Sequence, residues 1–109
     1  MPLDDEEDGE RTWTHKPITR SNGSIYEGQI DSNGKRDGHG ILIDEAKNKV
    51  FEGTWRKGQL SGHGRIIIIG DEVQEGEFED GLLHGLATIF LTAGEKYRGE
   101  WKANKRDGE

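Results

Sequence analysis

Four histidines and many carboxylates are the residues of this 109-residue chain that could bind a metal or move protons. His39 and His63 each stand between two glycines, so they occupy equivalent places in a repeating pattern. If each copy of the pattern adds two β-strands, the two imidazoles lie about 10 Å apart. One zinc ion, with Zn–N bonds of about 2.0–2.1 Å, cannot bridge that distance. His84 stands before its glycine, in a different place. We therefore expect no metal site and no cofactor.

The carboxylates of the repeats alternate with positions expected in the core. This alternation predicts that they lie on a solvated face, where a basic neighbour across the strands adds about 0.2–1 kcal/mol per pair. The set is Glu27, Glu52, Glu75, Glu77 and Glu100. No Ser or Thr has the His and Asp partners of a nucleophile triad, and the glycines do not precede a helix as a phosphate loop requires. We expect no catalytic residue and no enzyme activity.

Two further sets of side chains would bind a partner without reacting. An aromatic set should share one face of a sheet, as a groove for a peptide or a helix or else as simple core: Tyr26, Phe51, Trp55, Phe78, Tyr97 and Trp101. A basic set falls in the first turn of each repeat, along one edge, where each charge would add about 1 kcal/mol toward anionic headgroups: Lys35, Arg36, Arg56, Lys57, Lys105 and Arg106. The acidic pair Glu79 and Asp80 interrupts that edge, and nucleic acid is not expected as a partner.

The residues in these sets recur at regular spacing, because the sequence contains an internal repeat. Four segments align on Gly28, Gly53, Gly76 and Gly99, which are 25, 23 and 23 residues apart. Each copy begins with alternating aromatic, polar and glycine residues, a pattern of period two that is typical of a strand. A turn and a second β-rich run follow, at residues 41–43, 65–69 and 87–91. The pattern predicts one hairpin per repeat in an elongated, single-layer antiparallel sheet of about eight strands, with no helix.

Turn residues separate the expected strands. The first turns are Asn33-Gly34, Lys57-Gly58 and Asp80-Gly81. The second turns lie at Asn48, Gly70-Asp71 and Ala93-Gly94. Asn48 is expected to adopt a positive φ, because Asn is the usual substitute for Gly in that conformation.

Glycines inside the strands need a different explanation, since glycine weakens a strand. A partner strand without a side chain makes room for an aromatic ring, which predicts that Trp55 lies across Gly64 and Phe78 across Ala87. On this interpretation a set of glycines determines the fold: Gly28, Gly38, Gly40, Gly53, Gly62, Gly64, Gly76, Gly85 and Gly99.

Charge and apolar content divide the chain into three parts. Residues 1–12 are expected to form a disordered acidic tail, because Asp4 to Glu10 carry six of the seven net negative charges. Residues 13–25 are a degenerate leading strand and turn, in which Pro17 suits an edge strand. Residues 26–109 are the repeats, divided as 26–50, 51–73, 74–96 and a partial 97–109. The chain has no cysteine, no apolar run of membrane-spanning length and no secretory leader, so an intracellular, cytoplasmic place is expected.

The unit Tyr-x-Gly-x-Trp, followed by Asn-Gly-Lys-Arg-x-Gly-x-Gly and a β-rich run, resembles the MORN (membrane occupation and recognition nexus) repeat. Residues 26–40 and 97–108 carry the resemblance best. Departures are Ile30 and Gln74 at aromatic places and Ala87 at a glycine place. The resemblance implies attachment to protein or lipid, since proteins with such repeats include cytoskeletal and ciliary scaffolds, membrane-tethering proteins and some enzymes with a separate catalytic domain.

We therefore expect a non-catalytic scaffold that binds another protein within a larger assembly. One alternative is a peripheral module on anionic phospholipid, associated with membrane or cytoskeleton. A second is the repeat region of a larger enzyme, such as a SET-type methyltransferase or a phosphatidylinositol phosphate kinase. Self-association into a homodimer, through the open edge after residues 96–102 or through the aromatic face, is a further expectation.

Overall fold

A computed structural model of the protein describes residues 10–14, 16–102 and 105–106. Within them the chain forms ten strands: β1 (Thr12–Trp13), β2 (Ile18–Thr19), β3 (Ile25–Ile30), β4 (Arg36–Ile43), β5 (Lys49–Arg56), β6 (Gln59–Ile68), β7 (Glu72–Glu79), β8 (Leu82–Leu91), β9 (Lys96–Lys102) and β10 (Lys105–Arg106).

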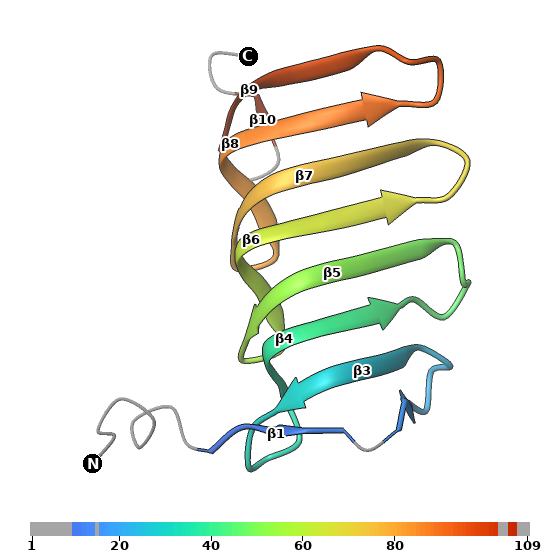
Figure 1. Ribbon diagram of the computed structural model, residues 1–109, viewed down its shortest axis with the longest axis vertical. Coiled ribbons are helices and arrows are strands. Elements are labelled where there is room, and N and C mark those ends of the chain that lie inside the picture. Colours follow the sequence, from blue (N-terminus) through green and yellow to red (C-terminus); the bar gives the residue numbers. More distant parts are fainter. Residues whose placement is uncertain (1–9, 15, 103–104, 107–109) are drawn as a thin grey trace.

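All the strands belong to one antiparallel sheet. From β3 to β10 each strand pairs with the next one in the chain, and β1 and β2 both pair with the free edge of β3 (Figure 1). The molecule measures 44 × 31 × 19 Å, with the repeats stacked along its long axis. The predicted single-layer antiparallel sheet is confirmed, and the described residues include no helix. The strands exceed the expected eight because β1, β2 and β10, of two residues each, add to the seven long strands β3 to β9.

One glycine or alanine from each long strand stands in a continuous row across the sheet. The row runs through cross-strand partners from one edge of the long strands to the other: Gly28, Gly40, Gly53, Gly64, Gly76, Ala87 and Gly99. The second strands of the repeats, β4, β6 and β8, begin before the β-rich runs expected at residues 41–43, 65–69 and 87–91, so they are longer than expected. At the left of Figure 1 the strands bend backward, and the turns on that side lie behind the rest of the sheet.

The bend encloses the core on one face, which we call the inner face. Its buried side chains come from both sides of the glycine row: Tyr26, Trp55, Leu60, Phe78, Leu83, Ala87 and Ile89. The Trp55 indole donates a hydrogen bond of 2.9 Å to the Gly40 carbonyl, and a Cβ on Gly64 would lie 3.2 Å from Phe78 Cδ1. The rings thus use the space that glycine leaves, but in the preceding repeat. Our assignment of Trp55 to Gly64 and Phe78 to Ala87 was wrong, because each ring extends toward β4 or β6 and not toward the second strand of its own hairpin.

The first turns of the second and third repeats are tight two-residue loops, as predicted. Lys57 and Gly58 have φ of 51° and 85°, and Asp80 and Gly81 have φ of 54° and 86°. Two positive φ values in succession are typical of the hairpin turn whose twist matches its strands. The Gly58 amide donates to the carbonyl of Arg36, at 3.0 Å, so this turn is tied to the preceding repeat.

The turn between β4 and β5 corrects one prediction. Lys47, not Asn48, has the positive φ, at 61°. Asp44 Oδ1 accepts hydrogen bonds from the amides of Asn48 (3.0 Å) and Lys49 (3.1 Å). Because this carboxylate holds the end of the loop, the left-handed residue falls one position earlier, where the Lys47 amide donates to the Asp44 carbonyl.

Candidate functional site

The six aromatic residues expected to line a partner groove share the inner face but differ in exposure. Tyr26, Trp55 and Phe78 are 2%, 3% and 4% exposed, so these three are core of this chain. Phe51 and Trp101 are half-buried against that core, while Tyr97 on the edge strand β9 is 49% exposed. Whether a partner contacts the exposed end of this set stays a prediction.

Arg36, expected at a basic edge, is part of the inner-face packing. Its guanidinium carbon lies 4.9 Å from the centre of the Trp55 ring, and its Nη2 donates a 2.7 Å hydrogen bond to the Gly58 carbonyl. Tyr26 packs edge-on against Trp55, with ring centres 6.0 Å apart. Burial lowers the pKa of Arg36, and burial raises the pKa of Tyr26 to about 12. This cation is part of the packing around Trp55 and holds the neighbouring turn.

The other basic residues lie where the first turns were expected. Lys35, Arg56 and Lys57 are exposed at the folded-back edge. Glu79 and Asp80 occupy the equivalent place one repeat later and are exposed too. Lys105 and Arg106 form β10, beside Lys102 and Trp101, but their side chains lie outside the described residues. The edge therefore carries both signs of charge.

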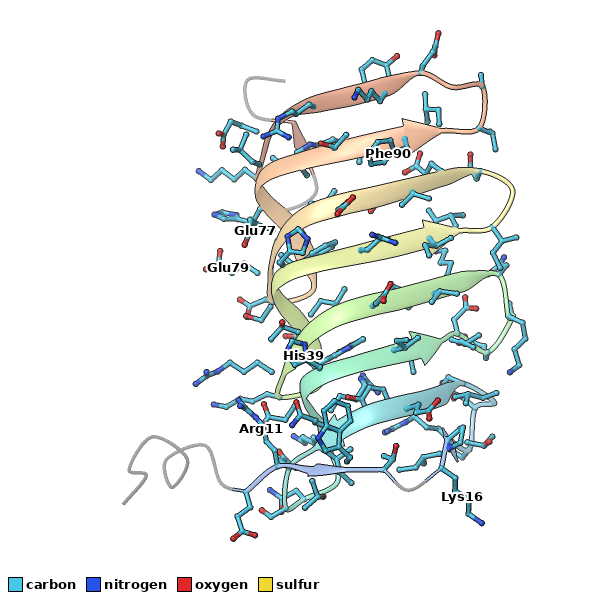
Figure 2. All side chains as sticks on the ribbon, viewed as in Figure 1. Arg11, Lys16, His39, Glu77, Glu79 and Phe90 are labelled. Atoms are coloured by element: carbon cyan, nitrogen blue, oxygen red, sulfur yellow. The ribbon has the colours of Figure 1, made fainter. Side chains whose placement is uncertain are left out.

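The opposite side of the sheet, the outer face, carries the three described histidines and the repeat carboxylates. His63 lies 3.6 Å from both Glu75 and Glu77, and His84 lies 3.4 Å from Glu79. His39 is exposed, on the side facing the viewer in Figure 2. Glu27, Glu52, Glu77 and Glu100 are exposed as predicted, whereas Glu75 is half-buried beside Arg65, at 3.8 Å. Among the described residues no group of three or more His, Cys, Asp or Glu side chains has an arrangement that could hold a metal ion.

A row of apolar side chains crosses the outer face on the flat half of the sheet. We call it the outer apolar row, and its members are successive cross-strand partners on β3 to β8: Ile25, Ile43, Val50, Ile67, Val73 and Phe90. The first five are half-buried and Phe90 is 38% exposed. Ile69, just beyond β6, is 60% exposed. In the described part of the chain no second layer lies over this face (Figure 1).

A second row, the outer charged row, runs beside the first and lies two residues away from it on each strand. Its members are also cross-strand partners: Glu27, Ile41, Glu52, Arg65, Glu75, Thr88 and Arg98. Carboxylates predominate on β3 to β7, and a guanidinium closes the row on β9. The exposed Ile41 adds an apolar contact between Glu27 and Glu52.

Two shallow hollows lie where the outer charged row meets the glycine row. The first, of about 430 Å³, is lined by Trp13, Glu27, Ile41 and Glu52 over the backbone of Gly40 and Gly53. The second, of about 490 Å³, is lined by His63, Glu75, Glu77, Phe90 and Arg98 among others. Carboxylates, an imidazole and exposed apolar side chains suit contacts with another protein, where aromatic anchors and polar rims combine.

The outer apolar row was missed as a site by reasoning from the sequence, although a signal for it exists. In the first three repeats the first strand carries an apolar residue directly before the position that faces the core, as in Ile25-Tyr26, Val50-Phe51 and Val73-Gln74. Neighbouring residues of a strand point to opposite faces, so such pairs indicate a sheet that is apolar on both sides. Only residues 66–69 were interpreted in that way.

Comparisons with known proteins agree with this geometry. The model of the MORN repeat family matches residues 26–45, 51–67, 75–90 and 97–109. Over 95 residues the chain is 33% identical to Alsin from Rattus norvegicus and to Alsin from Homo sapiens. The match covers 79% of this chain but 6% of those relatives, so the chain spans a small part of their length. Within the described residues, no helix is long and apolar enough to cross a membrane. The four matched repeats, each one hairpin of the sheet, show that the chain belongs to the MORN repeat family.

Proposed function

We propose that this MORN module is a non-catalytic scaffold that binds protein through the outer face of its sheet. The observation that carries the proposal is the outer apolar row, which crosses six strands and remains partly exposed on a sheet of one layer. A single layer cannot bury both of its faces by itself. The bend closes the inner face over the aromatic core, and the outer face retains the apolar surface typical of an interaction site.

Rigid spacing suits this face to a scaffold role. Neighbouring strands lie about 4.8 Å apart, so each hairpin adds two residues to each outer row and extends both rows by about 10 Å. Backbone hydrogen bonds across the whole sheet hold these rows in place, and little ordering is required when a partner binds. The absence of cysteine in the sequence is consistent with a reducing, intracellular setting for this function.

The test compares two variants that carry the same substitution on different faces. Ile67→Lys places a charge in the middle of the outer apolar row, and Ile18→Lys places one on the exposed edge strand β2. Each protein serves as bait in cell extract, with cross-linking and mass spectrometry of the captured proteins. We expect Ile67→Lys to lose the proteins that both the original chain and Ile18→Lys retain. Equal capture by all three baits would contradict a role for the outer face.

Binding to anionic phospholipid is the second candidate, because Lys35, Arg56 and Lys57 lie on one edge. The proposal is weakened by Arg36, which packs on Trp55, and by Glu79 and Asp80 on the same edge. Co-sedimentation with phosphatidylserine vesicles at low and high salt tests it, since headgroup binding weakens as salt screens the charges. A larger protein that joins these repeats to a catalytic domain remains a separate hypothesis.

A further inference from the structure

The outer face has an approximate two-fold pattern about its middle strand. Of the seven long strands, β6 is the fourth, with β3, β4 and β5 on one side and β7, β8 and β9 on the other. A two-fold axis parallel to β6, in front of the outer face, would place β5 opposite β7, β4 opposite β8, and β3 opposite β9 of a second copy. Each row would then face the same row of the other copy.

The members of the outer apolar row on β4 to β8 match one another under this operation, while Ile25 on β3 faces Lys96 on β9. Ile67 on β6 meets its own counterpart, Val50 meets Val73, and Ile43 meets Phe90. Ile69, which follows β6 and is 60% exposed, also lies close to the axis. Ile69 and Phe90, two exposed apolar side chains of the outer face, would thus be covered, and two single layers would become the two sheets of a sandwich about 10 Å apart.

The ends of the outer charged row are complementary under the same operation. Glu27 on β3 would face Arg98 on β9, and the symmetry makes this contact twice. Both side chains are exposed, and neither has an ion pair within the described residues. On the axis, two Arg65 guanidinium groups would be surrounded by Glu52 and Glu75 of both copies.

The area of this surface is sufficient for a weak but specific dimer. Seven strands at ~4.8 Å and about five residues of each strand at ~3.4 Å give roughly 550–600 Å² per copy. The total of roughly 1,100–1,200 Å² is near the lower limit of stable protein interfaces. An anionic membrane suits this face less well, because Glu27, Glu52 and Glu75 would face its headgroups.

We propose that the protein which binds the outer face is a second copy of this chain, paired face to face about an axis along β6. This proposal rests on the proposed function, since it names the occupant of the same surface. The dimer does not cover the folded-back edge or its basic turns.

A chain without cysteine allows a direct test. Ile67→Cys introduces one thiol, and on the axis it lies opposite its own counterpart in the second copy. Facing sheets keep Cα atoms about 10 Å apart, too far for a disulfide but within reach of a short bis-maleimide. We expect efficient cross-linking of Ile67→Cys and little of Ile18→Cys, whose thiol would lie at the exposed edge strand β2. Equal, low yields for both variants would overturn the proposal.

A second measurement does not depend on changing Ile67. Chains with Ile43→Cys are mixed with chains with Phe90→Cys, which the two-fold operation places opposite each other. The mixture should give mainly the mixed dimer, and each variant alone should give little. Separately, Glu27→Arg or Arg98→Glu alone should weaken the dimer roughly tenfold, and the two together should restore it. Failure of the mixed cross-link, or of the double variant to restore binding, contradicts the proposed geometry.

Failure of this inference and failure of the proposed function have different signatures. A chain that stays monomeric, yet loses other captured proteins with Ile67→Lys and not with Ile18→Lys, keeps its scaffold role and has a different occupant. A basic amphipathic helix of another protein would give that result. A chain that neither self-associates nor loses captured proteins would contradict both proposals.

Discussion

The two faces of this sheet have similar repeats but opposite environments. On the inner face Tyr26, Trp55 and Phe78 lie over a row of glycines and are buried within the chain. On the outer face Ile67, Val73 and Phe90 occupy equivalent strands and remain partly or largely exposed. A bend of the strands toward one side separates the two environments (Figure 1). The side chains inside the bend fold the molecule, and those outside it are available to a partner.

We therefore expect residues of the inner face to determine stability and residues of the outer face to determine binding. Changes on the inner face should lower the free energy of unfolding, because they open a packed core or crowd it. Changes of comparable size on the outer face should leave folding largely intact and alter association.

The largest effect is expected for Trp55→Ala. The indole is buried, donates to the Gly40 carbonyl and carries the Arg36 guanidinium on its face. Its removal should cost about 3–5 kcal/mol, the usual range for a buried aromatic residue, as measured by urea unfolding. Phe90→Ala, an aromatic truncation on the outer face, is the matched control and should cost much less. Similar losses for both variants would show that the faces do not differ.

Gly40→Ala should destabilise the chain by about 1–3 kcal/mol. A Cβ at this position would overlap the Tyr26 ring and hydroxyl, so the ring must move out of the core. Gly99→Ala is the control from the same row, since a Cβ there has no neighbour within 4 Å. Thermal unfolding of both variants measures the difference, and an equal shift in Tm would contradict the crowding explanation.

Alkaline pH should weaken the inner face through Tyr26. Burial raises its pKa from 10.0 to about 12, so the folded state keeps a proton that the unfolded chain releases above about pH 10. Stability from this group is complete below pH 10 and decreases as pH rises toward 12, by an amount on the order of 2 kcal/mol. In Tyr97→Phe, the phenolate absorbance of Tyr26 should rise near pH 12 and not near pH 10.

The smallest effect is expected at a turn that belongs to neither face. Lys57 has a positive φ of 51° next to Gly58, and Asn-Gly is the preferred pair for such a turn. Lys57→Asn should therefore stabilise the fold by about 0.5–1 kcal/mol, as measured by thermal unfolding. Lys49→Asn, at an exposed position of β5, is the control and should not stabilise. A lower Tm for Lys57→Asn would contradict the turn assignment.

The sequence predicted the repeat, the hairpins and the two tight turns because each depends on local spacing and on glycine. It also predicted which aromatic residues share a face, since period two determines that choice. The direction of the bend depends on contacts between repeats, and for this reason Trp55 and Phe78 were assigned to the wrong glycines. Arg36 was mistaken for a free edge charge because its contact with Trp55 spans two repeats. The outer apolar row was not predicted, because only the aromatic residues were assigned to a face. The Val and Ile residues beside them indicate a second apolar face.

The measurement that tests the central claim most directly is solution mass by light scattering, at two protein concentrations about a hundredfold apart. The original chain and Ile18→Lys should shift from monomer toward dimer as concentration rises, while Ile67→Lys stays monomeric with an unchanged Tm. That result would assign folding to the inner face and association to the outer face. A monomer of the original chain at both concentrations, or a dimer that Ile67→Lys leaves intact, would contradict self-association through the outer face.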